Sequence, residues 1–329
     1  MTFRPRPFEP LFRNQHLETI AAHFWPRPDP DLVLPPERRF VRTEPEVEVL
    51  VESQRPAEHL GHVVLIHGLE GSGKAGYMRS MSAAALAAGY AVHRFHMRSC
   101  GGTGSRCNTL YHAGLTSDLL AFLRQLAAPA LLVGFSLGGN VALKLAGELG
   151  ESAAGLIHGV CAVSTALDLA ACARRIHQRD NFFYERRFVR NMLARLRATG
   201  RYTARDLAGL HSVIGIDDRI TAPSFGFGNA ENYYRTQSAL GFLGAIRVPV
   251  LLIQSKDDSF VPFAAFQSEA VRSNPHIDLL ATEHGGHVGF IARRLPRLWL
   301  DETVIQWILA VRAANELGAG AVQVLNGRV

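Results

Sequence analysis

The 329-residue chain is 47% hydrophobic and 19% charged, with 35 Lys and Arg residues against 29 Asp and Glu residues. This apolar share excludes a disordered chain, and the unperiodic scatter of 30 Gly and 16 Pro excludes a collagen-like one. No apolar run approaches the roughly 18 residues of a membrane-spanning helix, so no stable membrane insertion is expected. The Arg- and Pro-rich start of the chain has no apolar stretch typical of a secretory signal.

Cysteine and histidine spacing argues against a bound metal or other cofactor. The four cysteines show no CxxC spacing, so neither a zinc site nor a disulfide framework is indicated, and a reducing compartment, the cytoplasm, is the expected location. His93 and His96 lie three apart on a predicted strand and point to opposite faces. His59, His62 and His67 lack an HExxH pattern or a carboxylate at ligand spacing.

The net charge of +6 comes almost entirely from arginine, which is densest between Arg174 and Arg205. Binding of nucleic acid uses such charge to neutralise phosphates, and this stretch is the alternative site for it. No recognition motif accompanies the arginines, so we interpret them as a solvated helical face and expect no nucleic-acid partner.

Residues 37–56 predict two short alternating strands, with Val47, Val49 and Val51 on one face of a half-exposed antiparallel edge. From residue 61 the pattern changes to short, fully apolar runs, each followed by a turn residue and a helical stretch. These runs predict core strands at 62–68, 90–97, 130–136, 159–165, 249–255 and 276–282. Helices are expected at 76–88, 117–127, 138–148, 263–272 and 297–316. The alternation predicts one α/β domain over residues 1–329, with a mostly parallel sheet covered by helices on both faces.

The strand and helix rhythm fails between residues 168 and 245. This stretch carries the dense arginines and two aromatic clusters but no clear βαβ unit. We predict a helical cap inserted over the carboxyl edge of the sheet, where open α/β sheets form their ligand crevices.

The sequence Gly134-Phe135-Ser136-Leu137-Gly138 fits the pattern GxSxG between a predicted buried strand and a predicted helix. In that context the serine stands on a sharp strand-to-helix turn, which needs small neighbours because a Cβ there meets the adjoining backbone. Ser136 is therefore the candidate nucleophile.

A serine hydroxyl needs a base and an orienting acid, which in this arrangement follow in the order Ser, Asp or Glu, His. Asp258 follows the strand at 249–255 and His287 follows the strand at 276–282, both at the edge where Ser136 emerges. We prefer Asp258 over its neighbour Asp257. Hydrolases of this kind carry the pattern of an acid, two further residues and then Val-Pro, and this pattern begins at Asp258. We prefer His287 over His284 because glycines flank it on both sides.

The oxyanion of such a reaction needs hydrogen-bond donors. The backbone N–H groups of Leu137, directly after the nucleophile, and of Leu69, in the loop after the first core strand, are the candidates. The same loop imitates a phosphate-binding motif, because Gly68 to Lys74 reads GLEGSGK. The full motif requires Ser or Thr next, where Ala75 stands, so nucleotide binding is not expected.

Seven ordered motifs resemble the YheT-like α/β-hydrolases, and the resemblance runs over nearly the whole chain. The motifs are FRNQHLETI at 12–20, HGLEGS at 67–72, MRSCGG at 97–102, YHAGLTSD at 111–118, GFSLGGN at 134–140, NYY at 232–234 and HGGHVGF at 284–290. The resemblance implies an α/β-hydrolase fold and a serine esterase with the triad Ser136, Asp258 and His287. It also implies carboxylic esters of short or medium acyl chains as substrates.

Several readings remain open beside that resemblance. Transfer of the acyl group to an alcohol shares the acyl-enzyme with hydrolysis, and a hydrolase fold without turnover would serve as a binding scaffold. Lys74 departs from the family loop and is expected to alter the mouth of the site. The apolar stripe of the N-terminal segment, formed by Leu17, Ile20, Phe24 and Trp25, is expected to pack back onto the domain. Tyr111 and His112 have either a structural role or a place in the acyl pocket.

Overall fold

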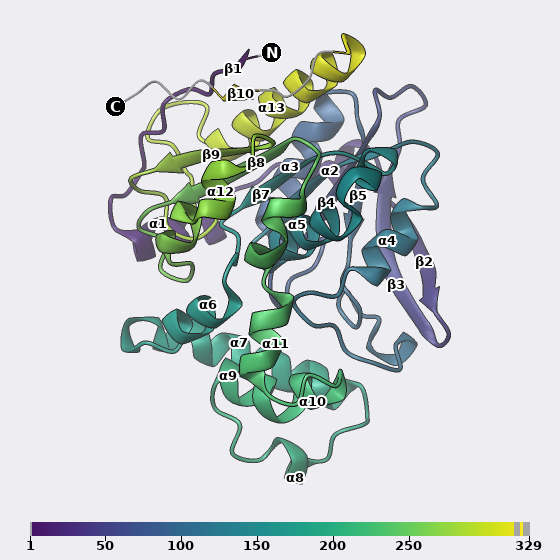
Figure 1. Cartoon of the computed structure of the whole chain (residues 1–329), viewed down its shortest axis with the longest axis vertical. Helices are drawn as coiled ribbons and strands as arrows, with labels where there is room; N and C mark the ends of the chain where they lie inside the picture. Colours follow the sequence, from purple (N-terminus) through teal and green to yellow (C-terminus); the bar gives the residue numbers. More distant parts are fainter. Residues whose placement is uncertain (1, 319–322, 325–329) are drawn as a thin grey trace.

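A computed structural model describes residues 2–318 and 323–324 of the chain. Its centre is an eight-stranded sheet of order β2-β3-β5-β4-β6-β7-β8-β9 (Figure 1). The strands are β2 (Glu37–Glu44), β3 (Val47–Gln54), β4 (His62–Ile66), β5 (Ala91–Phe95), β6 (Ala130–Phe135), β7 (Ile157–Val163), β8 (Val250–Ser255) and β9 (Ile277–Thr282). The pairs β2–β3 and β3–β5 are antiparallel and the others are parallel. A short parallel pair joins β1 (Thr2–Phe3) to β10 (Gln323–Val324).

Helices cover both faces of the sheet. They are α1 (Gln15–Phe24), α2 (Pro30–Val33), α3 (Gly76–Ala87), α4 (Ser117–Leu123), α5 (Leu137–Leu149), α12 (Glu269–Ser273) and α13 (Trp299–Glu316). Side chains of α3 and α13 share one buried cluster with Val63 and Leu65 of β4, whereas α4, α5 and α12 share another with Val64 and Ile66. Alternate residues of one strand thus enter opposite cores, so the central strands read as continuous apolar runs. Within the described part of the chain, no helix has the length and apolar character to span a membrane.

The six predicted core strands are confirmed as β4 to β9, and the α/β-hydrolase arrangement of a mostly parallel sheet is confirmed with them. Two helices are shorter than predicted. The helix expected at 117–127 ends at Leu123, and the one expected at 263–272 is a 3₁₀ turn, Phe263–Gln267, followed by α12. Ser268, in extended conformation, separates the latter two elements.

The expectation of a half-exposed antiparallel edge is right for β2 and wrong for β3. Val47, Val49 and Val51 are buried as predicted, but Glu52 and Gln54 on the other face are buried as well. Polar groups of other segments cover this face of β3. The Gln54 amide donates to the Pro30 carbonyl oxygen, 3.0 Å away, and the Glu52 carboxylate contacts His96. Polar side chains with buried partners cannot be told from solvated ones by alternation alone.

The prediction for the N-terminal helix is also wrong in its orientation. Leu17, Ile20 and Phe24 of α1 are exposed, and the buried residues of the helix are Glu18 and Ala22. The Glu18 carboxylate accepts the backbone N–H groups of Phe12 and Ile291, for which the described residues offer no other acceptor. Because Glu18 therefore faces inward, the apolar stripe lies on the outer side of the helix.

Between β7 and β8 the chain forms a group of helices that lies below the sheet in Figure 1. They are α6 (Leu169–Ile176), α7 (Phe182–Ala198), α8 (Ala204–Leu207), α9 (Val213–Ile216), α10 (Ala222–Ser224) and α11 (Ala230–Gln237), with a π-helical turn at Asp217–Thr221. The inward side chains of α7, α8 and α9 form a buried cluster of their own, to which Leu110 alone adds from outside the group among the described residues. Those of α6, α10 and α11, such as Leu169, Ala222 and Tyr233, instead belong to the sheet core that contains α5. These helices enter at the carboxyl end of β7, where the active-site loops also lie.

Candidate active site

Ser136 stands between β6 and α5 with φ at 52° and ψ at −117°. This left-handed backbone conformation is unusual for a residue with a side chain and is held here by close packing of the turn. A Cβ on Gly134 would lie 2.5 Å from the Gly138 carbonyl oxygen, and one on Gly138 would lie 2.3 Å from the Ile66 carbonyl oxygen. The glycines of the GxSxG pattern are therefore required by backbone contact, and the turn lifts the Ser136 hydroxyl off the end of the sheet.

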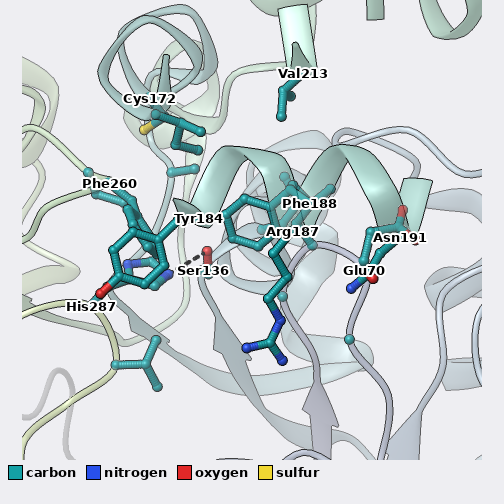
Figure 2. A pocket seen from close by; sticks show the side chains of 18 of the residues that line it. Glu70, Ser136, Cys172, Tyr184, Arg187, Phe188, Asn191, Val213, Phe260 and His287 are labelled. Carbon is teal, nitrogen blue, oxygen red and sulfur yellow. Dashed lines mark hydrogen bonds between the residues drawn. The ribbon is translucent and has the colours of Figure 1, made fainter. Parts of the chain in front are cut away.

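The structure brings Ser136, His287 and Asp258 together from three separate loops. His287 Nε2 lies 3.1 Å from Ser136 Oγ, the contact drawn as a dashed line in Figure 2. His287 Nδ1 lies 3.1 and 3.0 Å from the two carboxylate oxygens of Asp258. An Nδ1–H donated to Asp258 leaves Nε2 free to accept the serine proton, which is the arrangement a general base requires.

The neighbouring carboxylates Asp257 and Asp258 have different partners. Asp258 Oδ1 accepts the N–H groups of Phe260 and Val261 at 2.8 and 3.0 Å, which hold the carboxylate in place beside His287. Asp257 instead lies 3.1 Å from His284 Nδ1 and accepts the Gly286 N–H at 3.0 Å. Asp257 and His284 therefore brace the loop that carries His287, and neither contacts Ser136.

The loop at 67–71 lies next to the serine. A Cβ on Gly68 would come within 3.2 Å of Ser136 Cβ, so only glycine lets this loop approach so closely. The N–H groups of Leu69 and Leu137 have no hydrogen-bond acceptor among the described residues. Two unpaired donors beside a nucleophile are what a developing oxyanion requires.

The buried His67 ring holds the start of the 67–71 loop in place. Its Nδ1 lies 2.8 Å from the Gly68 carbonyl oxygen, and its Nε2 accepts the Met97 N–H at 3.2 Å. Burial, with the nearby His96 ring, lowers the pKa of His67 to about 3, so the ring is neutral, and the two contacts define which nitrogen carries the hydrogen. His67 is a positioning residue that sequence reasoning treated only as a possible metal ligand.

A cavity of about 360 Å³ opens onto Ser136 and His287. One wall comes from α1 and the 67–71 loop, and the other from α6, α7 and α11 between β7 and β8. Figure 2 shows Tyr184 and Phe260 beside His287, with Phe188 and Arg187 reaching from α7. Tyr111 and His112 both line this cavity, whereas Lys74 is exposed and lies outside the lining, next to Ala75, which belongs to it. The effect of Lys74 on the mouth stays a prediction.

An ion pair deep in the cavity joins the 67–71 loop to α7. Arg195 Nε lies 2.9 Å from Glu70 Oε1, with both side chains at most one-tenth exposed, and the Tyr111 hydroxyl donates to the same carboxylate oxygen at 3.0 Å. Burial alone would lower the pKa of the Arg195 guanidinium, but the Glu70 carboxylate more than offsets this and raises it. Because Glu70 directly follows Leu69, this pair holds the proposed oxyanion donor in place. Local sequence patterns could not predict this ion pair, since its partners are 125 residues apart.

Helix α1 holds the histidine loop from the other side. Thr19 Oγ1 accepts the His287 N–H at 2.9 Å, and Glu18 accepts the N–H groups of Phe12 and Ile291, both at 2.8 Å. Burial raises the pKa of the Glu18 carboxyl to about 7, partly opposed by these backbone donors. The motif at 12–20 carried both residues, but its local pattern does not reveal contacts with a loop near the other end of the chain.

Metal-ligating side chains do not gather in the part of the chain that the structure describes. No group of three or more His, Cys, Asp or Glu residues there could hold a metal ion. His62 and His93 lie 3.0 Å apart through ring nitrogens, but no carboxylate or thiol completes a set with them among the described residues.

A model of the alpha/beta hydrolase family matches residues 63–296. The protein printed as "Putative esterase YheT" from Escherichia coli (strain K12) is 33% identical over 90% of this chain and 91% of its own length. This chain belongs to the alpha/beta hydrolase family, as a YheT-like member.

Other similarities agree with that membership. A monoacylglycerol lipase of Saccharomyces cerevisiae is 28% identical over 75% of this chain and 58% of its own length. Among solved structures, the Pyrococcus furiosus esterase Pf2001 superposes with a TM-score of 0.57 over 86% of this chain and 98% of that chain. At 20% identity the latter likeness supports the fold alone.

Proposed function

We propose that this alpha/beta hydrolase is a serine carboxylesterase that forms an acyl-enzyme on Ser136. The observation that carries the proposal is the 3.1 Å contact between Ser136 Oγ and His287 Nε2, continued at 3.0 Å to Asp258. The relatives named as an esterase and a lipase support an ester as the substrate.

In the first half-reaction, Ser136 Oγ attacks the ester carbonyl carbon while His287 Nε2 takes the serine proton. The N–H groups of Leu69 and Leu137 stabilise the oxyanion, and Asp258 stabilises the imidazolium through Nδ1–H. The intermediate collapses as the bond to the alcohol oxygen breaks, and His287 returns the proton to that oxygen. An alcohol leaves and the acyl group stays on Ser136.

Water completes the cycle. His287 accepts a proton from water as its oxygen attacks the acyl carbon, and Ser136 leaves with that proton when the second intermediate collapses. The products are a carboxylic acid and the free enzyme. An alcohol in place of water would give a new ester by the same steps, and the ratio of acid to ester with added ethanol separates the two.

We further propose that residues 168–245 act as a cap that sets substrate length. Leu169, Cys172 and Ala173 of α6 and Phe188 of α7 give the cavity an apolar wall. A volume of about 360 Å³ suits small-molecule sites and supports short or medium acyl chains. The four cysteines are buried free thiols, which supports a cytoplasmic location.

Turnover of p-nitrophenyl butyrate and octanoate tests the proposal. We expect Ser136→Ala to lower kcat by about 10⁴-fold or more, whereas Ser152→Ala, at an exposed serine after α5, leaves it unchanged. A fluorophosphonate probe should label wild type at Ser136 and leave Ser136→Ala unlabelled. Equal rates in wild type and Ser136→Ala would overturn the assignment.

A further inference from the structure

Helix α1 turns its apolar side to solvent at the mouth of the cavity. Leu17, Ile20 and Phe24 are 52%, 44% and 76% exposed, while Glu18 and Ala22 on the opposite side are buried. A surface helix ordinarily buries its apolar stripe against the core. Here none of the described residues covers it, so the stripe is free to contact something outside the chain.

Helix α7 extends this apolar surface. Phe182 and Phe183 at its start are 53% and 82% exposed, with ring centroids 5.5 Å apart. The two helices are neighbours, because the His16 ring stacks on Tyr184 at 5.8 Å and His23 Nε2 lies 3.4 Å from Arg187.

The five exposed apolar side chains are here named the rim. It consists of Leu17, Ile20 and Phe24 of α1 and Phe182 and Phe183 of α7. Ile20 and Phe24 also line the cavity, so the rim borders the opening itself. Contiguous exposed apolar side chains around an opening differ from the scattered ones that any protein surface carries.

Unpaired positive charge accompanies the rim. Residues 174–197 contain eight arginines and only two carboxylates, of which Asp180 pairs with Arg175 and Glu185 is buried against His177. Arg186, Arg190 and Arg197 are exposed on α7, and none has a carboxylate partner among the described residues. A binding partner that complements the rim and these arginines therefore carries negatively charged groups next to apolar groups.

We propose that the rim is a docking surface for an anionic lipid bilayer, with the apolar side chains entering the headgroup layer and the α7 arginines meeting lipid phosphates. Apolar side chains flanked by arginine are the combination that binds helices to such interfaces. A second copy of the chain fits less well, because it would bring two arginine-rich faces together. The surface needs no catalytic residue, so the inference does not rest on the proposed function.

Vesicle sedimentation tests the docking. The probes are vesicles of phosphatidylcholine alone and of phosphatidylcholine with an equal part of phosphatidylglycerol. We expect the full chain to sediment with the anionic vesicles, less so as salt rises, and only weakly with the neutral ones. Ser136→Ala should bind like wild type, which separates this result from any failure of the esterase assignment. Failure to sediment with anionic vesicles, or equal binding to both kinds, overturns the proposal.

Two surface variants away from the cavity lining identify the docking residues. We expect the double variant Leu17→Ser with Phe183→Ser to weaken binding to anionic vesicles at least about tenfold. Arg186→Gln with Arg190→Gln should weaken it roughly 25-fold, since each arginine near a lipid surface contributes about a fivefold factor. Both variants should keep wild-type melting temperatures and turnover of a soluble ester.

Matched controls lie elsewhere on the surface. Leu309→Ser on α13, and Arg42→Gln with Arg124→Gln near the β2 edge, alter exposed residues of the same kinds and should bind like wild type. Rim variants that bind like these controls overturn the proposal. A second outcome also overturns the proposal: sedimentation velocity without lipid shows a wild-type dimer, and the double variant Leu17→Ser with Phe183→Ser is a monomer.

Discussion

Thr19 Oγ1 in α1 accepts a hydrogen bond of 2.9 Å from the backbone N–H of His287, 268 residues further along the chain. The contact fixes the loop that presents the imidazole to Ser136. The N-terminal helix thereby supports the proposed active site, although none of its residues touches the serine hydroxyl.

Replacing Thr19 by Val keeps the shape of the side chain and removes the acceptor. The His287 N–H then lies partly buried without a partner, which costs about 1–3 kcal/mol. We expect a kcat on p-nitrophenyl butyrate lowered about tenfold with little change in KM, because the imidazole is less well placed while the acyl pocket is intact. Thr19→Ser, which retains the hydroxyl, should restore kcat. If Val and Ser variants lose the same activity, the hydrogen bond is not what matters.

The adjacent carboxylates Asp257 and Asp258 allow a matched comparison of which one orients His287. Asp258→Asn should lower kcat about 10⁴-fold, because an amide facing Nδ1 favours the wrong imidazole tautomer. Asp257→Asn loosens only the contacts with His284 and Gly286, and we expect a loss within about tenfold. Steady-state kinetics with thermal melts of both variants give the comparison. Similar losses of kcat would show that Asp257 shares the orienting role.

Glu18 predicts a pH dependence of stability. Its pKa is raised to about 7 from the usual 4.5, mainly by burial, so the folded protein holds this proton more tightly than the unfolded chain does. The stabilisation is complete below about pH 4.5 and is lost as pH rises through about 7. Relative to Glu18→Gln, the wild-type free energy of unfolding should fall across this range by on the order of 2 kcal/mol.

Urea unfolding at a series of pH values measures that difference. Glu151→Gln, at an exposed carboxylate, is the control and should follow wild type throughout. Parallel curves for wild type and Glu18→Gln would contradict the assignment of this titration to Glu18.

The buried pair Glu70–Arg195 predicts strong coupling between the cap and the oxyanion loop. Arg195→Met leaves the Glu70 carboxylate unpaired, and breaking a buried pair in this way costs about 3–5 kcal/mol. We expect a lower melting temperature and a reduced kcat, since the loop carrying Leu69 loses its anchor. Adding Glu70→Gln should recover part of the stability in a double-mutant cycle. Arg197→Met, on the exposed side of the same helix, is the control; equal effects at both arginines would refute the coupling.

Local sequence patterns predicted much of the fold because the determinants are local. Apolar runs such as those at 130–136 and 249–255 are too short for typical helices and are followed by turn residues, so they indicate buried strands. The GxSxG turn carries its steric requirement in its own glycines. The choice of Asp258 over Asp257 followed from spacing; the Asp258 carboxylate lies 3.0 Å from His287 Nδ1, and its role as the orienting acid stays a prediction.

The remaining features depend on contacts between distant segments. The outward stripe of α1 follows from the bond between Glu18 and the Ile291 N–H, and the anchor of the oxyanion loop follows from Arg195. Amphipathic periodicity shows which side of a helix is apolar. It does not show whether hydrogen bonds from a polar side chain to a distant segment place that apolar side toward solvent.

Helices α7, α8 and α9 bury an apolar cluster to which, among the described residues, only Leu110 adds from outside the cap. The interior of this part can be redesigned with little disturbance of the sheet. Helices α6, α10 and α11 are less exchangeable, because Leu169, Ala222 and Tyr233 belong to the sheet core. The salt bridge to the loop at 67–71 is a second constraint. A grafted cap that lacks Arg195 would strand a buried carboxylate beside the nucleophile, so a working chimaera must take Glu70 and Arg195 from the same parent.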